Sequence, residues 1–126
     1  MYQYKKEVKL SYEGAVEKAR QELSKEGFGV MTEIDVKATL KKKLDVDFED
    51  YIILGACNPS MAYKALLAEQ DLGLMLPCNL IVYTKNKKTF VAAIRPTVQL
   101  GKIDNEKLCE IAPIVEAKLK KVIDSI

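Results

Sequence analysis

The 126-residue sequence contains no histidine and no tryptophan. Histidine is the usual base of Ser-His-Asp and Cys-His nucleophiles, and it is a ligand in His-bound zinc and two-histidine iron sites. These classes of site are therefore excluded. Any chemistry must come from carboxylates, cysteines, lysines, tyrosines or backbone groups.

The sequence also lacks an excess of charge of one sign, because its 20 basic and 18 acidic side chains leave a net charge of +2. A dedicated nucleic-acid binder usually has a strongly basic face, so we expect no nucleic-acid partner. No apolar run approaches the ~18 residues of a membrane span, and MYQYKKEVKL lacks the apolar core of a signal peptide, so we expect no membrane association. Three cysteines fit poorly with a secreted disulfide framework, which favours a cytoplasmic location.

Enough apolar material is present for one domain over residues 1–126, since 48% of the residues are hydrophobic. The periodicity predicts alternating strands and helices in the order β-α-β-α-β-α-β-β-α. We expect strands near 2–10, 29–34, 51–57, 80–84 and 89–95, and helices after Ser11, Asp35, Asn58 and Asp104. Residues 72–77 are predicted to be an apolar connection, the stretch after Pro96 to be irregular, and Pro113 to kink or split the last helix.

The three strands at 51–57, 80–84 and 89–95 are apolar at both alternating sets of positions. In the first of them Ile52, Leu54 and Ala56 would face one way, and Ile53, Gly55 and Cys57 the other. A sheet with helices on one face alone would show polar alternation instead. We therefore expect further helices, a partner subunit or a ligand on the second face, and an isologous dimer is the commonest solution.

Two Cys-Asn dipeptides are the sharpest candidates for a site. Cys57 ends a predicted strand, and Asn58 and Pro59 then begin a helix, a position that lowers the pKa of a thiol. The same geometry offers an anion site formed by the N–H groups of residues 60–62, starting with Ser60, and the Asn58 amide. The pair Cys78 and Asn79 begins the strand that follows that helix.

Strand direction decides whether the two thiols meet. A parallel crossover would place Cys57 and Cys78 at opposite ends of the sheet, whereas antiparallel strands would bring them together. Both could equally be buried packing residues, as Cys109 in the last helix is expected to be. Two thiolates without histidine need further ligands and no CxxC spacing exists, so we predict no metal and no cofactor.

Charged side chains supply two lesser candidates. Glu33 projects from a predicted strand and Asp35 caps the next helix, so the two carboxylates could do acid–base work in a shared pocket or be a surface acid and a cap. Arg95 could clamp an anion or form a surface salt bridge.

Three motifs in order, GFGVMTEIDVKATLKKKL, ILGACNP and GLMLPCNL, resemble the family of domain of unknown function 302. The resemblance implies an α+β fold with a curved, largely antiparallel sheet packed on helices, in a TATA-binding-protein-like arrangement, and a homodimer. An antiparallel sheet would bring Cys57 and Cys78 together. Arg95 stands where the family pattern has an acid. The family's activity is unknown, so the resemblance leaves open whether this protein is an enzyme.

Three hypotheses follow for function. The first is a homodimer, joined through the sheet or adjacent helices, that binds a small ligand or anion near the Cys-Asn motifs, with Cys57, Asn58, Ser60, Cys78, Asn79, Glu33 and Asp35 as candidate residues. The second is a thiol-dependent redox or sulfur-transfer protein that uses Cys57 and Cys78. The third is an interaction module without a ligand.

Overall fold

The computed structural model describes residues 1–126 and contains every predicted strand and helix. The order is β1 (Gln3–Val8), α1 (Tyr12–Lys25), β2 (Gly29–Asp35), α2 (Val36–Leu44), β3 (Tyr51–Cys57), α3 (Pro59–Ala68), β4 (Cys78–Lys85), β5 (Lys88–Ile94) and α5 (Glu106–Ser125). Two short elements complete it: the 3-10 helix η1 (Gln70–Met75) and the helical turn α4 (Pro96–Gln99).

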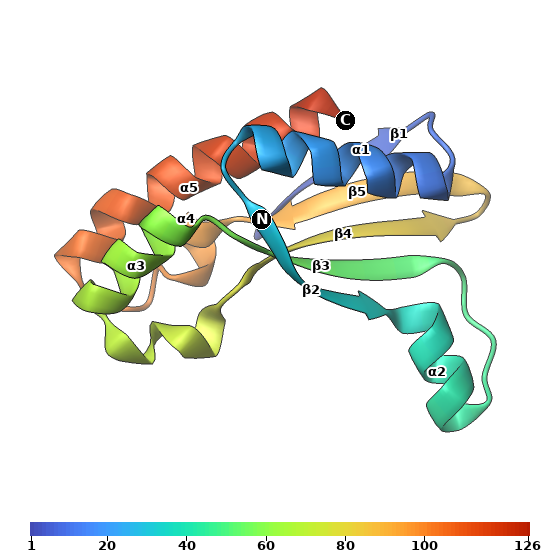
Figure 1. The fold of residues 1–126 in the computed structure, drawn as a ribbon, viewed down its shortest axis with the longest axis horizontal. Coiled ribbons are helices and arrows are strands. Elements are labelled where there is room, and N and C mark those ends of the chain that lie inside the picture. Colours follow the sequence, from blue (N-terminus) through green and yellow to red (C-terminus); the bar gives the residue numbers. More distant parts are fainter.

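The five strands form one antiparallel sheet in the order β1-β5-β4-β3-β2. The sheet is curved and the helices α1 and α5 lie along one of its faces (Figure 1). The predicted α+β class, with a curved antiparallel sheet packed on helices, is confirmed. The strand direction left open by the sequence is also decided, since β3 and β4 are antiparallel with Ala56 opposite Cys78.

The core lies between this sheet and the helices α1 and α5. Ser11 caps α1 through a 3.0 Å bond from the Gly14 N–H, and α1 ends before Gly27, whose φ is +84°. Asn105 caps α5. The amphipathic faces of both helices then bury apolar side chains against the sheet, among them Ala15, Ala19, Leu23, Leu54, Leu80, Val82, Val91, Leu119 and Val122.

Two connections and one helix differ from the sequence-based expectations. The predicted apolar connection at 72–77 is largely the 3-10 helix η1, and the stretch after Pro96, expected to be irregular, contains α4. Of the kink or split expected at Pro113, the split does not occur, because α5 runs through it as one helix. A proline inside a helix costs about 3 kcal/mol. Burial of Ala112, Val115 and Leu119 on the two sides of Pro113 offsets that cost.

The other face of the sheet carries no helix along its length (Figure 1). We call it the open face; it comprises the outward side chains of Tyr51, Ile53, Ile81, Tyr83, Phe90, Ala92 and Ile94. The prediction that the strands are apolar on both sides is confirmed, whereas no further helix of this chain provides the expected cover. None of the helices combines the length and the apolar character needed to cross a membrane.

Candidate functional site

Cys57 and Cys78 line one small cavity. They come together because β3 ends where β4 begins, with Ala56 directly opposite Cys78. The cavity lies at the start of α3 and holds about 30 Å³. Such a space accommodates about two or three water molecules, since one water needs about 10–15 Å³ measured in this way. It is far smaller than the roughly 300–1,000 Å³ of ordinary ligand pockets.

All three thiols are free. Burial, and then the neighbouring Cys57, raises the pKa of Cys78 to about 11, so this thiol is protonated at neutral pH. The thiolate is the nucleophilic form of cysteine, and Cys78 is therefore a poor nucleophile in the folded protein. The prediction that Cys109 is a packing residue is wrong, because Cys109 lies exposed on α5, away from this cavity.

Asn58 has a structural role at the first turn of α3. Its Oδ1 accepts hydrogen bonds from the Met61 N–H at 3.5 Å and from the Ser60 hydroxyl at 3.2 Å. Its Nδ2 donates to the Glu26 carbonyl at 3.3 Å, which ties α3 to the end of α1. Both ends of the amide and the Met61 N–H thus have protein partners, and little of the proposed anion cradle is left for a ligand.

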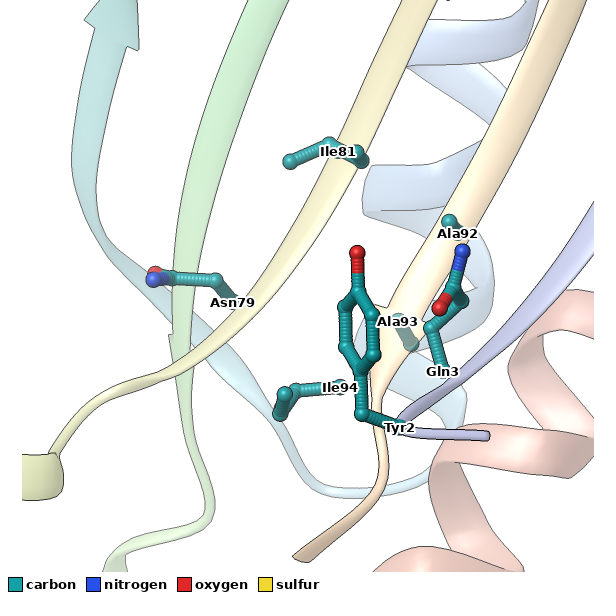
Figure 2. A pocket seen from close by; sticks show the side chains of 7 residues that line it. All are labelled: Tyr2, Gln3, Asn79, Ile81, Ala92, Ala93 and Ile94. Carbon is teal, nitrogen blue, oxygen red and sulfur yellow. The ribbon is translucent and has the colours of Figure 1, made fainter. Parts of the chain in front are cut away.

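Asn79 faces away from the thiols. It is opposite Gly55 on β3 and lies exposed on the open face, where it lines a hollow of about 160 Å³. Figure 2 shows Asn79 and Ile81 projecting from β4, with the Tyr2 ring standing over the sheet beside Ile94. The Cys78-Asn79 dipeptide therefore contributes to two separate places, because successive strand residues point to opposite faces.

Glu33 and Asp35 line neither the thiol cavity nor the hollow beside Asn79. Gly29 is opposite Cys57, whereas Glu33 is opposite Leu54 in the middle of the β2–β3 pair and Asp35 is opposite Ile52 at its far end. Glu33 forms an ion pair with Arg20 of α1. Asp35 accepts a 2.9 Å bond from the Ala38 N–H as the cap of α2.

A larger groove follows β4 along the open face. The hollow beside Asn79 shares Tyr2, Gln3 and Ile81 with a second hollow of about 650 Å³. The second hollow also reaches Lys5 and Lys85, and its remaining lining is Asp47, Phe48, Glu49, Tyr51, Tyr83 and Thr84. The groove thus has an amide at one end, an apolar middle and charged side chains at the other end.

An aromatic row lies along this groove, and two of its members, Tyr51 and Tyr83, line it. The rings of Tyr51, Tyr83 and Phe90 lie on three neighbouring strands and stack in sequence, with 5.3 Å between successive centroids. Lys5 Nζ lies 4.9 Å from the Phe90 centroid. Sequence reasoning missed this row, since the three residues become neighbours only through the strand register.

A buried carboxylate at the end of the sheet was missed as well. Glu116 of α5 accepts bonds from the Thr97 N–H at 3.0 Å, the Thr97 hydroxyl at 2.5 Å and Arg95 Nε at 3.3 Å. Burial raises its pKa, but the bonds from Thr97 and Arg95 outweigh this and hold the pKa below the usual value of 4.5. Arg95 is thus occupied by Glu116 rather than free to clamp an anion.

Comparison with known proteins places these features in a family. The family model described as domain of unknown function DUF302 matches residues 4–126. The chain belongs to this family. It is similar to a solved structure described as an uncharacterized conserved protein DUF302 from Bacillus stearothermophilus, with 32% identity and a TM-score of 0.93. That similarity covers 99% of this chain and 98% of the other.

The resemblance stated from the three motifs is therefore confirmed over nearly the whole chain. A search of the curated proteins finds no match. No group of three or more cysteine, aspartate or glutamate side chains is arranged to hold a metal ion.

Proposed function

We propose that this DUF302 protein is a homodimeric small-molecule-binding protein whose ligand occupies the groove along the open face. The observation that carries the proposal is an apolar sheet face that the chain leaves without helices, hollowed to about 160 Å³ and about 650 Å³ in two connected parts. Ligand sites in proteins have volumes of about 300–1,000 Å³, mostly apolar linings and a few polar groups that orient the ligand.

The polar groups of the groove suggest how a ligand would be oriented. At the narrow end the Asn79 amide can both donate and accept hydrogen bonds above the apolar floor of Ile81, Ala92 and Ile94. The proposed ligand is therefore a small apolar molecule with a hydrogen-bonding group at one end. This shifts the expected site away from the thiols, whose shared cavity is too small.

A second copy of the chain is the proposed cover of the groove. Contiguous exposed apolar patches larger than a few hundred Å² are rare on monomers and mark interaction surfaces. An isologous pair of open faces would close the missing wall of each groove. The proposal includes a cytoplasmic location, because three free cysteines suit a reducing compartment.

A titration of the protein with a library of small apolar amides, ketones and carboxylates, followed by two-dimensional NMR, tests the ligand. We expect shifts at Asn79, Ile81 and Ile94, and at least tenfold weaker binding for Asn79→Ala. The matched control is Gln21→Ala, which deletes an exposed side-chain amide on α1, and this variant should bind normally. If no compound shifts these residues, or if both variants bind equally, the ligand proposal is wrong.

Sedimentation equilibrium tests the dimer independently. The expected mass is about twice the 14.2 kDa of one chain. Ile81→Asp should give the monomer mass with unchanged helical circular dichroism, because its side chain lies on the open face outside the helix-packed core. A wild-type mass of one chain up to millimolar concentration would rule the dimer out.

The shared cavity of Cys57 and Cys78 supports a second candidate, a thiol-dependent redox or sulfur-transfer protein. In this case oxidised glutathione would accept two electrons and be released as two thiols, while Cys57 and Cys78 lose two protons and form a disulfide. A loss of two mass units in the intact protein, absent in Cys57→Ser, is the expected sign. Retention of all three free thiols after this treatment would dismiss the candidate.

A further inference from the structure

The segment around α2 has almost no contact with the core. We call residues Ile34–Glu49 the arm; it comprises the end of β2, all of α2 and most of the connection to β3. No arm residue is buried, and only Val36, Thr39 and Leu40 are partly shielded. Figure 1 shows α2 projecting from the end of β2, well away from the other helices.

A helix of this size needs packing to be stable. Isolated helices shorter than about 12–15 residues are marginal in water, and most helical stability in proteins comes from burying an apolar face. The helix α2 has 9 residues and buries none of them. Within one chain, the packing that normally stabilises such a helix is missing.

Two lysines on the polar side of the arm are already paired within the chain. Lys41 lies 3.0 Å from Asp45 and 3.4 Å from Asp47, and Lys37 lies 3.4 Å from Asp50. These pairs join α2 to the connection that follows it. All are exposed, and exposed ion pairs contribute little to stability. They give the arm its shape without supplying the apolar contacts that it lacks.

The apolar side of the arm has no partner. Ile34, Leu44, Val46 and Phe48 are 48%, 66%, 43% and 45% exposed. Phe48 also belongs to the groove on the open face, and its ring lies 6.2 Å from that of Tyr51. Through Phe48 the exposed apolar side of the arm therefore meets the open face.

Charges favour a second copy as the partner of this surface. The connection in the arm is acidic: Asp45 and Asp47 share the single Lys41, and Glu49 forms no ion pair within the chain. On the open face Lys5 and Lys85 border the groove, and neither of them forms an ion pair within the chain either. In an isologous pair, each arm can bring Glu49 to the unpaired lysines of the other copy.

The dimensions also fit. A helix of 9 residues is about 13 Å long and a strand of 7 residues spans about 23 Å, so the arm can lie within the face. We infer that in the dimer each arm packs over the open face of the other copy and covers its ligand groove. This inference rests on the dimer of the proposed function and adds the element that joins the two copies.

Sedimentation of Leu44→Glu tests the inference. The side chain is 66% exposed, so the substitution leaves the fold of one chain intact. We expect the dimer dissociation constant to rise at least 100-fold. The matched control is Leu74→Glu, which replaces a 90% exposed leucine of η1, outside the arm, and should leave the dimer unchanged.

Hydrogen exchange supplies a second measurement. The amides of α2 should become at least tenfold more protected when the protein concentration crosses the dimer dissociation constant, and the amides of α3 should not. A wild-type dimer that survives Leu44→Glu, with α2 exchange independent of concentration, overturns the arm contact but leaves the dimer standing. A wild type that never dimerises overturns both, while the NMR titration still decides on the ligand.

Discussion

The two faces of the sheet carry similar apolar side chains but differ in their cover. On the helix-covered face Leu54, Leu80 and Val91 are fully shielded by α1 and α5. On the open face their neighbours in the same strands, such as Ile53 and Ile81, stay partly exposed. The comparison teaches that apolar strand residues alone do not bring a helix onto a face, because the chain must also have an amphipathic helix in reach of it.

Truncation of one leucine should produce the largest difference between the faces. Leu54→Ala removes a side chain with no exposure from the core and should cost about 2–5 kcal/mol of unfolding free energy. Ile53→Ala, the next residue on the open face, should cost less than half as much in the monomer. Urea unfolding of both variants measures the two values.

Protein concentration sharpens this comparison. If a second copy covers the open face, the cost of Ile53→Ala should grow with concentration, since binding to the folded state adds stability by mass action. The cost of Leu54→Ala should stay constant. Equal concentration dependence for the two variants would contradict the assignment of Ile53 to an interface.

The substitution Gly55→Ala, which adds one methyl group, should lower the free energy of unfolding by about 1–3 kcal/mol, the usual range for overpacking. A Cβ at Gly55 would lie 2.7 Å from Pro77 Cγ and overlap the Thr32 hydroxyl. Gly29→Ala is the control, because a Cβ there meets no atom within 4 Å. Thermal melts should show a large fall in melting temperature for Gly55→Ala and almost none for Gly29→Ala. Equal melting temperatures for the two variants would refute the close packing at Gly55.

The contribution of Glu116 to the free energy of unfolding is expected to depend on pH. Its folded pKa is lowered, so its ionised form stabilises the fold above the unfolded value of 4.5, and that stability is lost as the pH falls through the folded pKa. Glu116→Gln should destabilise by about 1–3 kcal/mol at pH 7, because charged hydrogen bonds to Arg95 and Thr97 are weakened.

The difference between Glu116→Gln and the wild type should then shrink below pH 4.5, as the wild-type carboxyl takes up a proton. Denaturant unfolding of both proteins at pH 7, 5 and 3 measures this difference in stability. A difference that is constant over this range would mean that the charge of Glu116 has no part in its role.

Thiol labelling has the smallest expected effect on the fold and separates the covered interior from the surface. Cys109 is exposed and should react rapidly with an aromatic disulfide reagent at pH 8. Cys78, with its pKa raised to about 11 by burial, should react slowly until the pH approaches that value. Cys109→Ser removes the fast phase and identifies it. Rapid labelling of Cys78 in the folded protein at pH 8 would contradict its burial.

The local signals in the sequence predicted most of the secondary structure. Ser11 and Asp35 begin helices as expected, and Gly27 follows α1 in the left-handed region. The turn at Asn86 between β4 and β5 also has the positive φ, 53°, that its residue type tolerates. These features depend on a few neighbouring residues, so they can be read without knowing the fold. Pro113 is the exception, because its place inside α5 depends on burial against the sheet.

The candidate site could be predicted only in part for the same reason. The sequence singled out Cys57, Asn58, Cys78 and Asn79, but it could not assign Asn79 to the groove and Cys78 to the interior, because that division depends on strand direction and register. The aromatic row is likewise a product of register, and the Glu116 cluster joins residues that are distant in sequence.

The sequence by itself determined the absence of histidine chemistry, the order of the elements and the presence of a sheet that is apolar on both sides. Only the tertiary structure decided that the helices gather on one face and leave the other open, together with an arm that buries nothing. The physical reason is that amphipathicity and capping are local properties, whereas the cover of a sheet face depends on where the connections allow the helices to pack.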